Sequence, residues 1–246
     1  MKKLLLVAIA GLMLASLGLA SCSSGPMKIQ VVTDATWPPF EYVNEQTKQV
    51  EGFDIDIMNA IAEDQNLEIE YVNVAWDPLL AGMAQGTYDI AISCITITAD
   101  RAKDMLFSDP YYTAGQIVVV NKDNTTFTGR ENLTGNVGAQ LGTTGAMEVE
   151  KLTGVTLRNY DEIGMAFQDL MNGQISAVIC DSPVAYGYVN ANPSKLKTVG
   201  EMFTTESYGI ALSKGKTDLL KKINAGLKAI KAKGLIDQYA EKWLEK

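Results

Sequence analysis

The sequence predicts an α/β fold with mostly parallel sheets flanked by helices. From about residue 27 onwards, segments typical of strands alternate with segments typical of helices. The run Asp89 to Ile97 is rich in β-branched residues and apolar on both faces, which indicates a central strand of a covered parallel sheet. Asp77-Pro78 and Ser182-Pro183 each combine a capping side chain with a proline, a pattern typical of a helix start.

The first half of the chain contains two further strands and two helices. A short apolar run predicts the first strand, and apolar residues at helical spacing predict the first helix. Asp54 and Asp56 lie near the start of that helix, where its dipole favours acidic side chains. In order, we expect a strand at Ile29–Thr33, a helix at Phe53–Asn66, a strand at Leu67–Val74 and a helix capped by Asp77.

The second half repeats this alternation. Gly142-Thr143-Thr144-Gly145 closes one strand, and Gly173 and Gly234 each follow a helix, where a left-handed residue is common. In order, we expect strands at Ile117–Val120 and Val137–Leu141, a helix from about Ala146, a helix at Asp161–Asn172, a strand at Ser176–Cys180, a helix from Ser182, a strand at Tyr208–Ser213 and two closing helices.

Composition and charge exclude several classes of function. The 246 residues are 47% hydrophobic and 20% charged, which is typical of a globular chain of one or two domains. The formal net charge of −8 argues against nucleic acid, because phosphate binding requires clustered lysine and arginine. The chain has no histidine, which excludes Ser-His-Asp and Cys-His nucleophiles and HExxH zinc sites. We expect no metal and no cofactor.

The N-terminal segment reads as an export signal rather than as part of the fold. Lys2 and Lys3 precede the uncharged apolar run Leu4–Leu19, a pattern typical of a secretory signal peptide. Leu19-Ala20-Ser21-Cys22 then fits the bacterial lipobox. We expect an exported protein anchored at the cell membrane, with a lipoprotein signal peptide at residues 1–21, a lipid on Cys22 and a linker at 22–26. A plain secretory signal and an uncleaved membrane anchor are the alternatives.

Cys94 and Cys180 each end an apolar, strand-like run. An exported compartment permits a disulfide between them, whereas buried free cysteine is common and behaves as a small hydrophobic residue. We expect two free thiols, with a disulfide as the alternative.

Polar and aromatic side chains follow the predicted strands, at the end where open α/β sheets bind ligands. Arg101 can form a bidentate contact with a carboxylate, and Asp181 can accept an ammonium group. Trp37 and Trp76 can cover an alkyl or cationic side chain, and the Gly142–Gly145 turn presents backbone N–H groups to an anion. This set of groups suits a small zwitterion.

Each of these residues also has a purely structural interpretation. Arg101 is typical of a solvated surface residue, Asp34 and Asp181 of turn or helix caps, and the tryptophans of core or rim positions. The Gly142–Gly145 turn lacks the lysine of a phosphate-binding loop. The coincidence of these residues at successive strand ends, rather than any single one of them, indicates a ligand site.

Five segments carry a pattern known from one protein family. They are Asp34 to Phe40, Gly52 to Asp56, Tyr88 to Arg101, Phe107 to Tyr112 and Tyr208 to Ala211. In this order they resemble the polar amino-acid solute-binding proteins of bacterial ABC importers, a group that includes glutamine-, arginine-, lysine- and histidine-binding proteins. The resemblance extends from about Lys28 to the C-terminus.

The resemblance implies a two-lobe clamp of the type II periplasmic-binding-protein class, which closes around its ligand. Lobe 1 would comprise residues 27–112 and 208–246, and lobe 2 residues 113–207, joined by a two-strand hinge. The resemblance also places Cys94 and Cys180 on opposite lobes beside the cleft. A disulfide there would hold the clamp shut, which strengthens the prediction of free thiols.

The resemblance further implies how the amino-acid backbone of the ligand is held. Arg101 would bind the α-carboxylate, and Asp181, on the other lobe, would bind the α-ammonium. Hydroxyl and backbone groups would assist, those of Thr96 and of Thr143 or Thr144 at the carboxylate, and those near Ser93 and Cys94 at the ammonium.

The resemblance also assigns the ligand side chain to lobe 1. Trp37 and Trp76 occupy the positions of an aromatic clamp, Asp34 lies where relatives contact a side-chain donor, and Glu41 lies nearby in sequence. Two other positions depart from the family. Cys94 replaces the usual glycine or serine, and Gly145 stands where several binders of basic amino acids carry a side chain.

We therefore expect a monomeric binding protein that captures a free polar L-amino acid and delivers it to an ABC permease. Asp34 and Glu41 favour a side chain with hydrogen-bond donors, as in arginine, lysine or glutamine. Two alternatives are an enzyme similar to the cyclohexadienyl dehydratases, in which a cleft carboxylate acts as general acid, and a ligand-sensing domain that acts with a separate receptor.

Overall fold

The computed structural model describes residues 27–244 of the 246-residue chain. The predicted signal peptide, the lipid attachment at Cys22 and the linker at 22–26 lie outside the described residues. Within the described range, no helix combines the length and the hydropathy that crossing a membrane requires.

Lobe 1 is built around a five-stranded sheet with the strand order β5-β1-β6-β15-β7. Helices α1 and α6 pack on one face of this sheet, and α2 packs on the other. The elements of lobe 1 are β1 (Met27–Thr33), β2 (Thr36–Trp37), β3 (Glu41–Val43), β4 (Val50–Glu51), α1 (Phe53–Asp64), β5 (Leu67–Asn73), α2 (Trp76–Gln85), β6 (Ile90–Ala91), the 3₁₀ turn η1 (Arg101–Lys103), β7 (Met105–Phe107), β15 (Ala211–Ser213), α6 (Thr217–Ala232) and α7 (Leu235–Trp243).

Lobe 2 is built around a second five-stranded sheet with the order β11-β10-β12-β9-β13. Helix α3 packs on one face, and α4 and α5 pack on the other. Its elements are β9 (Gln116–Asn121), η2 (Arg130–Asn132), β10 (Gly135–Gln140), α3 (Thr144–Glu150), β11 (Val155–Tyr160), α4 (Ile163–Met171), β12 (Ala177–Asp181), α5 (Ser182–Ala191) and β13 (Leu196–Val199).

The two lobes share one topology. In each sheet the first three strands pair in parallel, and the fourth strand, β15 or β9, runs antiparallel to both of its neighbours. Four of the five strands in each sheet therefore point the same way, as expected for mostly parallel sheets. The reversed strand is the one that the chain enters on arriving from the other lobe.

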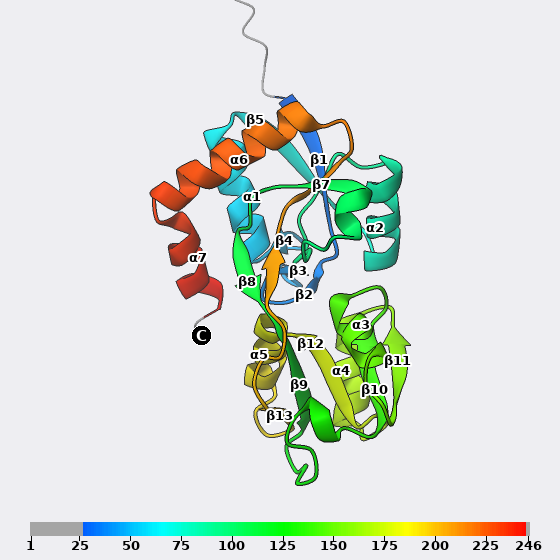
Figure 1. Ribbon diagram of the computed structural model, residues 1–246. Helices are drawn as coiled ribbons and strands as arrows, with labels where there is room; N and C mark the ends of the chain where they lie inside the picture. Colours follow the sequence, from blue (N-terminus) through cyan, green and yellow to red (C-terminus); the bar gives the residue numbers. More distant parts are fainter. Residues whose placement is uncertain (1–26, 245–246) are drawn as a thin grey trace, which may run out of the picture.

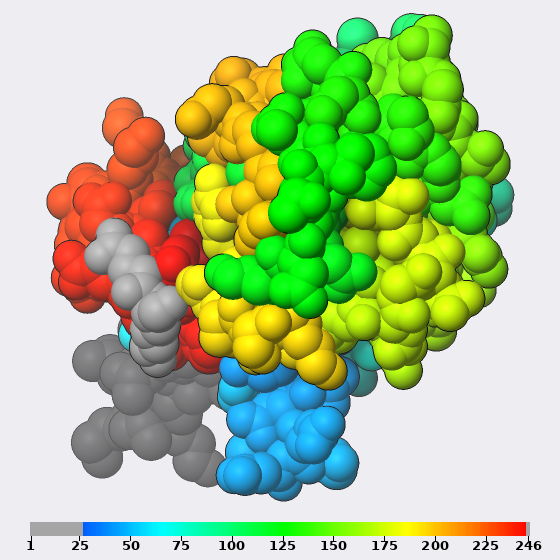
Figure 2. Space-filling model, turned by 90° about the horizontal axis from the view of Figure 1, so that it is seen from below, coloured from blue at the N-terminus to red at the C-terminus, as the bar shows by residue number. Residues whose placement is uncertain are grey.

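Two short strands carry the chain between the lobes (Figure 1). β8 (Tyr112–Ala114) leads to lobe 2 and β14 (Glu206–Tyr208) leads back, and they pair antiparallel with Ala114 opposite Glu206. Seen from its own end, lobe 2 forms a broad surface coloured green to yellow, with α7 in red beside it (Figure 2). The predicted α/β clamp with two lobes and a two-strand connection is confirmed.

Aromatic side chains fill the junction between the lobes. Phe40, Phe53, Tyr112 and Tyr208 pack with ring centroids 5.1–5.8 Å apart. Pairs at this separation contribute about 0.5–1.5 kcal/mol each beyond the burial of their area. The junction therefore fixes the two crossing strands against the β2–β3 region and the first turn of α1.

The predicted central strand over Asp89–Ile97 is wrong in length, because only Ile90–Ala91 forms β6. The sheet ladder ends before Cys94, whose positive φ of 49° turns the backbone away. Ile92 and Ile95 remain fully buried beyond the strand. Burial, rather than strand pairing, thus explains the continuous apolar pattern.

Other element boundaries also differ from the prediction. The expected strand Tyr208–Ser213 divides into β14 and β15, because the chain passes there from the connection into the lobe 1 sheet. The predicted caps Asp77 and Ser182 lie inside α2 and α5, whose N-cap residues, Ala75 and Asp181, make no side-chain cap bond. The strands β2, β3, β4, β7, β11 and β13 were not predicted, whereas β8 is one of the two strands of the expected connection.

Candidate functional site

A small cavity lies between the lobes, beyond the carboxyl ends of β6, β10 and β12. Its volume of about 10 Å³ is close to the least that holds one water molecule. Of the predicted site residues, Asp34 and Glu41 are not among its lining. The residues that line it are Trp37, Trp76, Ser93, Cys94, Thr96 and Arg101 from lobe 1, and Thr143, Thr144 and Asp181 from lobe 2.

Arg101 connects the two lobes. Its backbone N–H donates to Thr98 Oγ1 at 3.1 Å, and Arg101 is the first residue of the 3₁₀ turn η1. The guanidinium donates to the carbonyl of Thr96 at 2.9 Å and, across the cleft, to the carbonyl of Gly142 at 3.2 Å. Burial lowers the pKa of Arg101, opposed by Asp181 and by a further acid, Glu206. The guanidinium stays charged, because its intrinsic pKa is so high.

Asp181 is the last residue of β12 and is buried. Its carboxylate accepts hydrogen bonds from Gln116 Nε2 at 2.7 Å and from the Tyr208 hydroxyl at 2.5 Å. Burial, together with the charge of Glu206, raises the pKa of Asp181 to about 7. The side chain does not cap α5, so the structural interpretation of Asp181 as a helix cap is wrong.

Glu206, which sequence reasoning missed, joins both lobes from the crossing strand β14. Its Oε2 accepts hydrogen bonds from Thr96 Oγ1 of lobe 1 at 2.7 Å and from Thr144 Oγ1 of lobe 2 at 2.8 Å. Its Oε1 accepts from Gln116 Nε2 at 3.0 Å and from Thr204 Oγ1 at 3.1 Å. No local pattern marks Glu206, since its position depends on the pairing of β14 with β8.

Gln140 is a second missed residue, and it bridges the lobes directly. Its side-chain oxygen accepts from Trp37 Nε1 at 2.5 Å, and its amide donates to Asp34 Oδ2 at 2.9 Å and to the Asp161 carbonyl at 2.9 Å. Burial raises the pKa of Asp34, although Gln140 and Thr36 donate to it. Gln140 is the last residue of β10 and lies one residue before the end of the predicted strand, so the strand-end rule could have identified it.

The two tryptophans lie side by side, with ring centroids 6.4 Å apart and ring planes inclined by 27°. The guanidinium carbon of Arg101 lies 5.2 Å from the centre of the Trp76 ring, within cation–π range. The buried indole N–H of Trp76 has no hydrogen-bond partner among residues 27–244. Trp76 therefore offers the cavity both an aromatic face and a donor.

The Gly142–Gly145 turn leads into α3. Thr143 is the N-cap, and its Oγ1 accepts from the backbone N–H of Ala146 at 3.2 Å. A Cβ at Gly145 would lie 2.9 Å from both Gln116 Oε1 and the Ile179 carbonyl. No side chain fits at this position, because α3 approaches β9 and β12 so closely.

Glu41 lies beneath the cavity rather than in it. Its carboxyl is fully buried and accepts a hydrogen bond from Ser93 Oγ at 3.0 Å. Cys94 and Cys180 are both buried and both free, as the sequence predicted.

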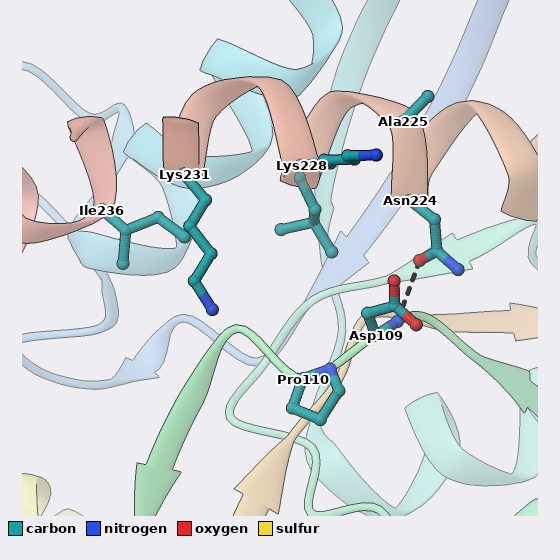
Figure 3. Close-up of a pocket in the computed structure, with 8 residues that line it drawn as sticks. Asp109, Pro110, Asn224, Ala225, Lys228, Lys231 and Ile236 are labelled. Carbon is teal, nitrogen blue, oxygen red and sulfur yellow. Dashed lines mark hydrogen bonds between the residues drawn. The ribbon is translucent and has the colours of Figure 1, made fainter. Parts of the chain in front are cut away.

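A separate surface groove of about 380 Å³ lies on lobe 1 between α6 and the segment at Asp109 and Pro110 (Figure 3). Asn224 Oδ1 accepts from the backbone N–H of Asp109 at 2.9 Å, and Lys228 and Lys231 extend over the groove. Its polar groups do not converge on one point, so this groove does not resemble a small-molecule site.

Comparison with known proteins agrees with this geometry. The chain matches the family described as bacterial extracellular solute-binding proteins, family 3, over residues 29–246. It is 35% identical over 235 residues to a probable histidine-binding protein of Neisseria gonorrhoeae, covering 92% of this chain and 87% of that protein. It is 34% identical over 250 residues to ABC transporter arginine-binding protein 1 of Escherichia coli (strain K12), covering 99% of each chain.

A solved structure is equally similar. An ancestral arginine-binding protein bound to arginine superposes with a TM-score of 0.83 at 41% identity, over 88% of this chain and 97% of that one. All three relatives are named as binding proteins rather than as enzymes. The chain belongs to the bacterial extracellular solute-binding proteins, family 3.

Proposed function

We propose that this protein captures a cationic L-amino acid, arginine before lysine, between its lobes and delivers it to the permease of an ABC importer. The observation that carries the proposal is the pairing of opposite charges from opposite lobes, Arg101 from lobe 1 and Asp181 from lobe 2, at one cavity. Arg101 would bind the α-carboxylate and Asp181 the α-ammonium. A zwitterion would then bridge the lobes through both of its charges.

The charge of the site favours a ligand with a second positive group. Asp181, Glu206 and Asp34 are acidic, whereas Arg101 is the basic residue among the cavity lining and its direct partners described above. The α-carboxylate of the ligand would neutralise the charge of Arg101, and its α-ammonium would neutralise the charge of one acid. A guanidinium or ammonium on the ligand side chain would compensate another, which the neutral amide of glutamine cannot do.

Asp34 and the two tryptophans are the groups that would receive this side chain. A cation between the rings of Trp37 and Trp76 would lie within about 6 Å of both, the range of cation–π attraction. Asp34 has one oxygen bonded to Thr36 and one to Gln140, so the ligand would displace or join the Gln140 amide as donor. A planar guanidinium suits both contacts better than an ammonium does.

Ligand entry would require the lobes to separate. The cavity volume of about 10 Å³ is far below that of any amino acid. Rotation about β8 and β14 would open the cleft, with residues 27–112 and 208–246 moving as lobe 1 and 113–207 as lobe 2. We further propose that the mature protein is a monomer tethered by lipid at Cys22, which would keep it beside the permease on the outer face of the membrane.

A thermal-shift screen of the mature protein without lipid against the twenty L-amino acids tests the proposal. A ligand at a hundred times its Kd stabilises the folded state by about 2.7 kcal/mol, so arginine and lysine should raise Tm clearly above the other amino acids. Agmatine, which is arginine without its carboxylate, is the matched control and should give little shift. Stabilisation by glutamate or leucine, or equal shifts with arginine and agmatine, would contradict the proposal.

A further inference from the structure

Two carboxyl groups of lobe 1 lie together beneath the cavity between the lobes. Glu41 comes from β3 and Asp54 from the first turn of α1, and both are completely buried. One oxygen of each carboxyl and the thiol of Cys94 lie within 4.8 Å of one another. Ser93 and Cys94, which lie directly above them, are part of the cavity lining.

The hydrogen bonds of this pair leave one oxygen without a donor. Glu41 accepts from Ser93 Oγ at 3.0 Å and from Cys94 Sγ at 3.7 Å. Asp54 Oδ2 accepts from the Cys94 backbone N–H at 3.0 Å and from the Tyr111 hydroxyl at 2.8 Å. Asp54 Oδ1 is buried and accepts no hydrogen bond from an N–H or O–H group of residues 27–244. A proton on the Glu41 carboxyl is the donor that would satisfy it.

The titratable groups around the pair also indicate that one of the two carboxyls is protonated. The titratable groups that face it are Asp34 from the β1–β2 loop, Cys94 after β6, Tyr111 before β8 and Tyr71 on β5. In the part of the chain that the structure describes, no lysine or arginine bonds to either carboxyl. Two buried carboxylates without a cation cannot both be ionised at moderate cost. Burial, with Asp54 beside it, raises the pKa of Glu41 well above its usual value.

We propose that Glu41 and Asp54 share one proton at neutral pH, and that this protonated pair positions the Ser93–Cys94 segment that lines the ligand cavity. Glu41 orients the Ser93 hydroxyl, which in turn accepts the backbone N–H of Asp34 at 3.0 Å. Asp54 holds the backbone N–H of Cys94, whose left-handed conformation needs external support. Glu41 is therefore a positioning residue that acts through Ser93 and does not itself contact the ligand.

The proposal predicts a specific dependence of stability on pH. In the unfolded chain Glu41 ionises near pH 4.3, whereas in the folded protein it keeps its proton to a much higher pH. Because its folded pKa is raised, its contribution to stability is fully present below pH ~4.3 and is lost as the pH rises through the folded pKa. The loss accumulates over the whole interval between these two values.

Glu41→Gln tests this directly, because the glutamine amide replaces the protonated carboxyl and carries no titratable proton. We expect the Tm of the wild type to fall relative to that of the variant as the pH rises from about 5 to about 8. Glu45→Gln/Glu63→Gln is the matched control, since it removes two exposed carboxylates after β3 and on α1. Its Tm should run parallel to that of the wild type over this range. A constant difference between Glu41→Gln and wild type would overturn the proposal.

Asp54→Asn keeps the proposal testable if Glu41→Gln does not fold. Its amide oxygen can accept from Cys94 and Tyr111 while its NH₂ group donates to Glu41, and its Tm should likewise fall less than that of the wild type as the pH rises. These melting curves need no ligand, so they stand apart from the proposed function. Zn²⁺ that raises the Tm of the wild type but not of Cys94→Ser would show a metal site instead, and would overturn the shared proton.

The positioning role rests on the proposed function and has its own readout. We expect the affinity of the wild type for arginine to weaken at alkaline pH as the pair loses its proton, and the affinity of Glu41→Gln to weaken less. Calorimetry of both proteins at several pH values measures the difference. Identical affinity profiles, combined with diverging melting curves, would leave the shared proton intact and overturn the positioning role.

Discussion

The two lobes have the same strand order, yet they present opposite charges to the cavity. β6 and β12 occupy the same third position in their sheets. Asp181 is the last residue of β12, whereas a segment that includes the buried residues Cys94 and Thr96 separates Arg101 from the end of β6. The shared strand order places the carboxyl ends of β6 and β12 at the cleft. The length of the segment after each strand then determines whether Arg101 or Asp181 is the charged residue that lies there.

The second strands of the two sheets show a similar contrast. β1 of lobe 1 is followed by Asp34 and Trp37, and β10 of lobe 2 ends in Gln140. The Gln140 side chain bonds to both Asp34 and Trp37 across the cleft. One equivalent pair of strands thus leads to the charges that would bind the proposed zwitterion, and the other carries a direct contact between the lobes.

Removal of the lobe 1 charge is the most severe test of this contrast. Loss of one partner of a buried charge pair costs about 2–5 kcal/mol, so Arg101→Ala should weaken the binding of arginine at least about thirtyfold. Isothermal titration calorimetry measures the change. Arg158→Ala, which alters an exposed arginine of lobe 2, should bind as the wild type does. Unchanged affinity of Arg101→Ala would remove this residue from the site.

The lobe 2 charge should make binding sensitive to acid. The pKa of Asp181 is about 7, so below this pH its carboxyl is protonated and must release the proton before it accepts an ammonium. Affinity should therefore fall about tenfold for each pH unit below 7, until the carboxyl is protonated in the complex as well.

Asp181→Asn should bind weakly and without this acid dependence, whereas the exposed Asp123→Asn should keep it. An affinity profile of the wild type that is flat between about pH 5 and pH 7 would show that Asp181 does not exchange its proton for the ligand.

The contact between the second strands should have a smaller effect. Gln140→Leu removes two hydrogen bonds across the cleft, each worth about 0.5–1.5 kcal/mol. We expect arginine binding about tenfold weaker and a larger radius of gyration in small-angle X-ray scattering. The exposed Gln174→Leu is the control. An unchanged radius would show that Gln140 does not hold the lobes together.

The smallest effect should come from a single bond of this contact. Trp37→Phe keeps an aromatic ring but removes the indole N–H that donates to Gln140. Loss of about 0.5–1 kcal/mol weakens binding about threefold. Trp243→Phe on α7 removes an indole bond to Asp56 far from the cleft and should leave the affinity unchanged. A loss as large as that of Gln140→Leu would mean that the indole ring of Trp37, and not only its N–H bond, contributes to binding.

Local pattern and sheet geometry together were enough to predict which strand ends meet at one cavity. Arg101, Thr143 and Asp181 follow or end strands, and parallel strands bring such positions to one edge. Glu206 was missed because only the pairing of β14 with β8 sets its place, and Gln116 because the pairing of β9 with β12 places it opposite Asp181. Glu41 was assigned to the ligand because it is near Asp34 in sequence, but the side chain points beneath the cavity.

The apolar pattern was also a poor guide to strand length. Ile92 and Ile95 are fully buried although they follow the end of β6. Sequence alone does not separate residues that are buried in a strand from residues that are buried in a loop beside it, because both exclude water equally.

The place of β15 in the lobe 1 sheet constrains the order in which the chain can fold. β15 lies between β6 and β7 but is the last strand in the sequence, whereas every strand of lobe 2 precedes residue 200. A chain that emerges N-terminus first can therefore complete lobe 2 while lobe 1 still lacks an interior strand. A chain truncated before Ala211 should lack the strand that joins β6 to β7 in the lobe 1 sheet. We therefore expect a stable fragment of such a chain to contain the residues of lobe 2 rather than the N-terminal residues of lobe 1.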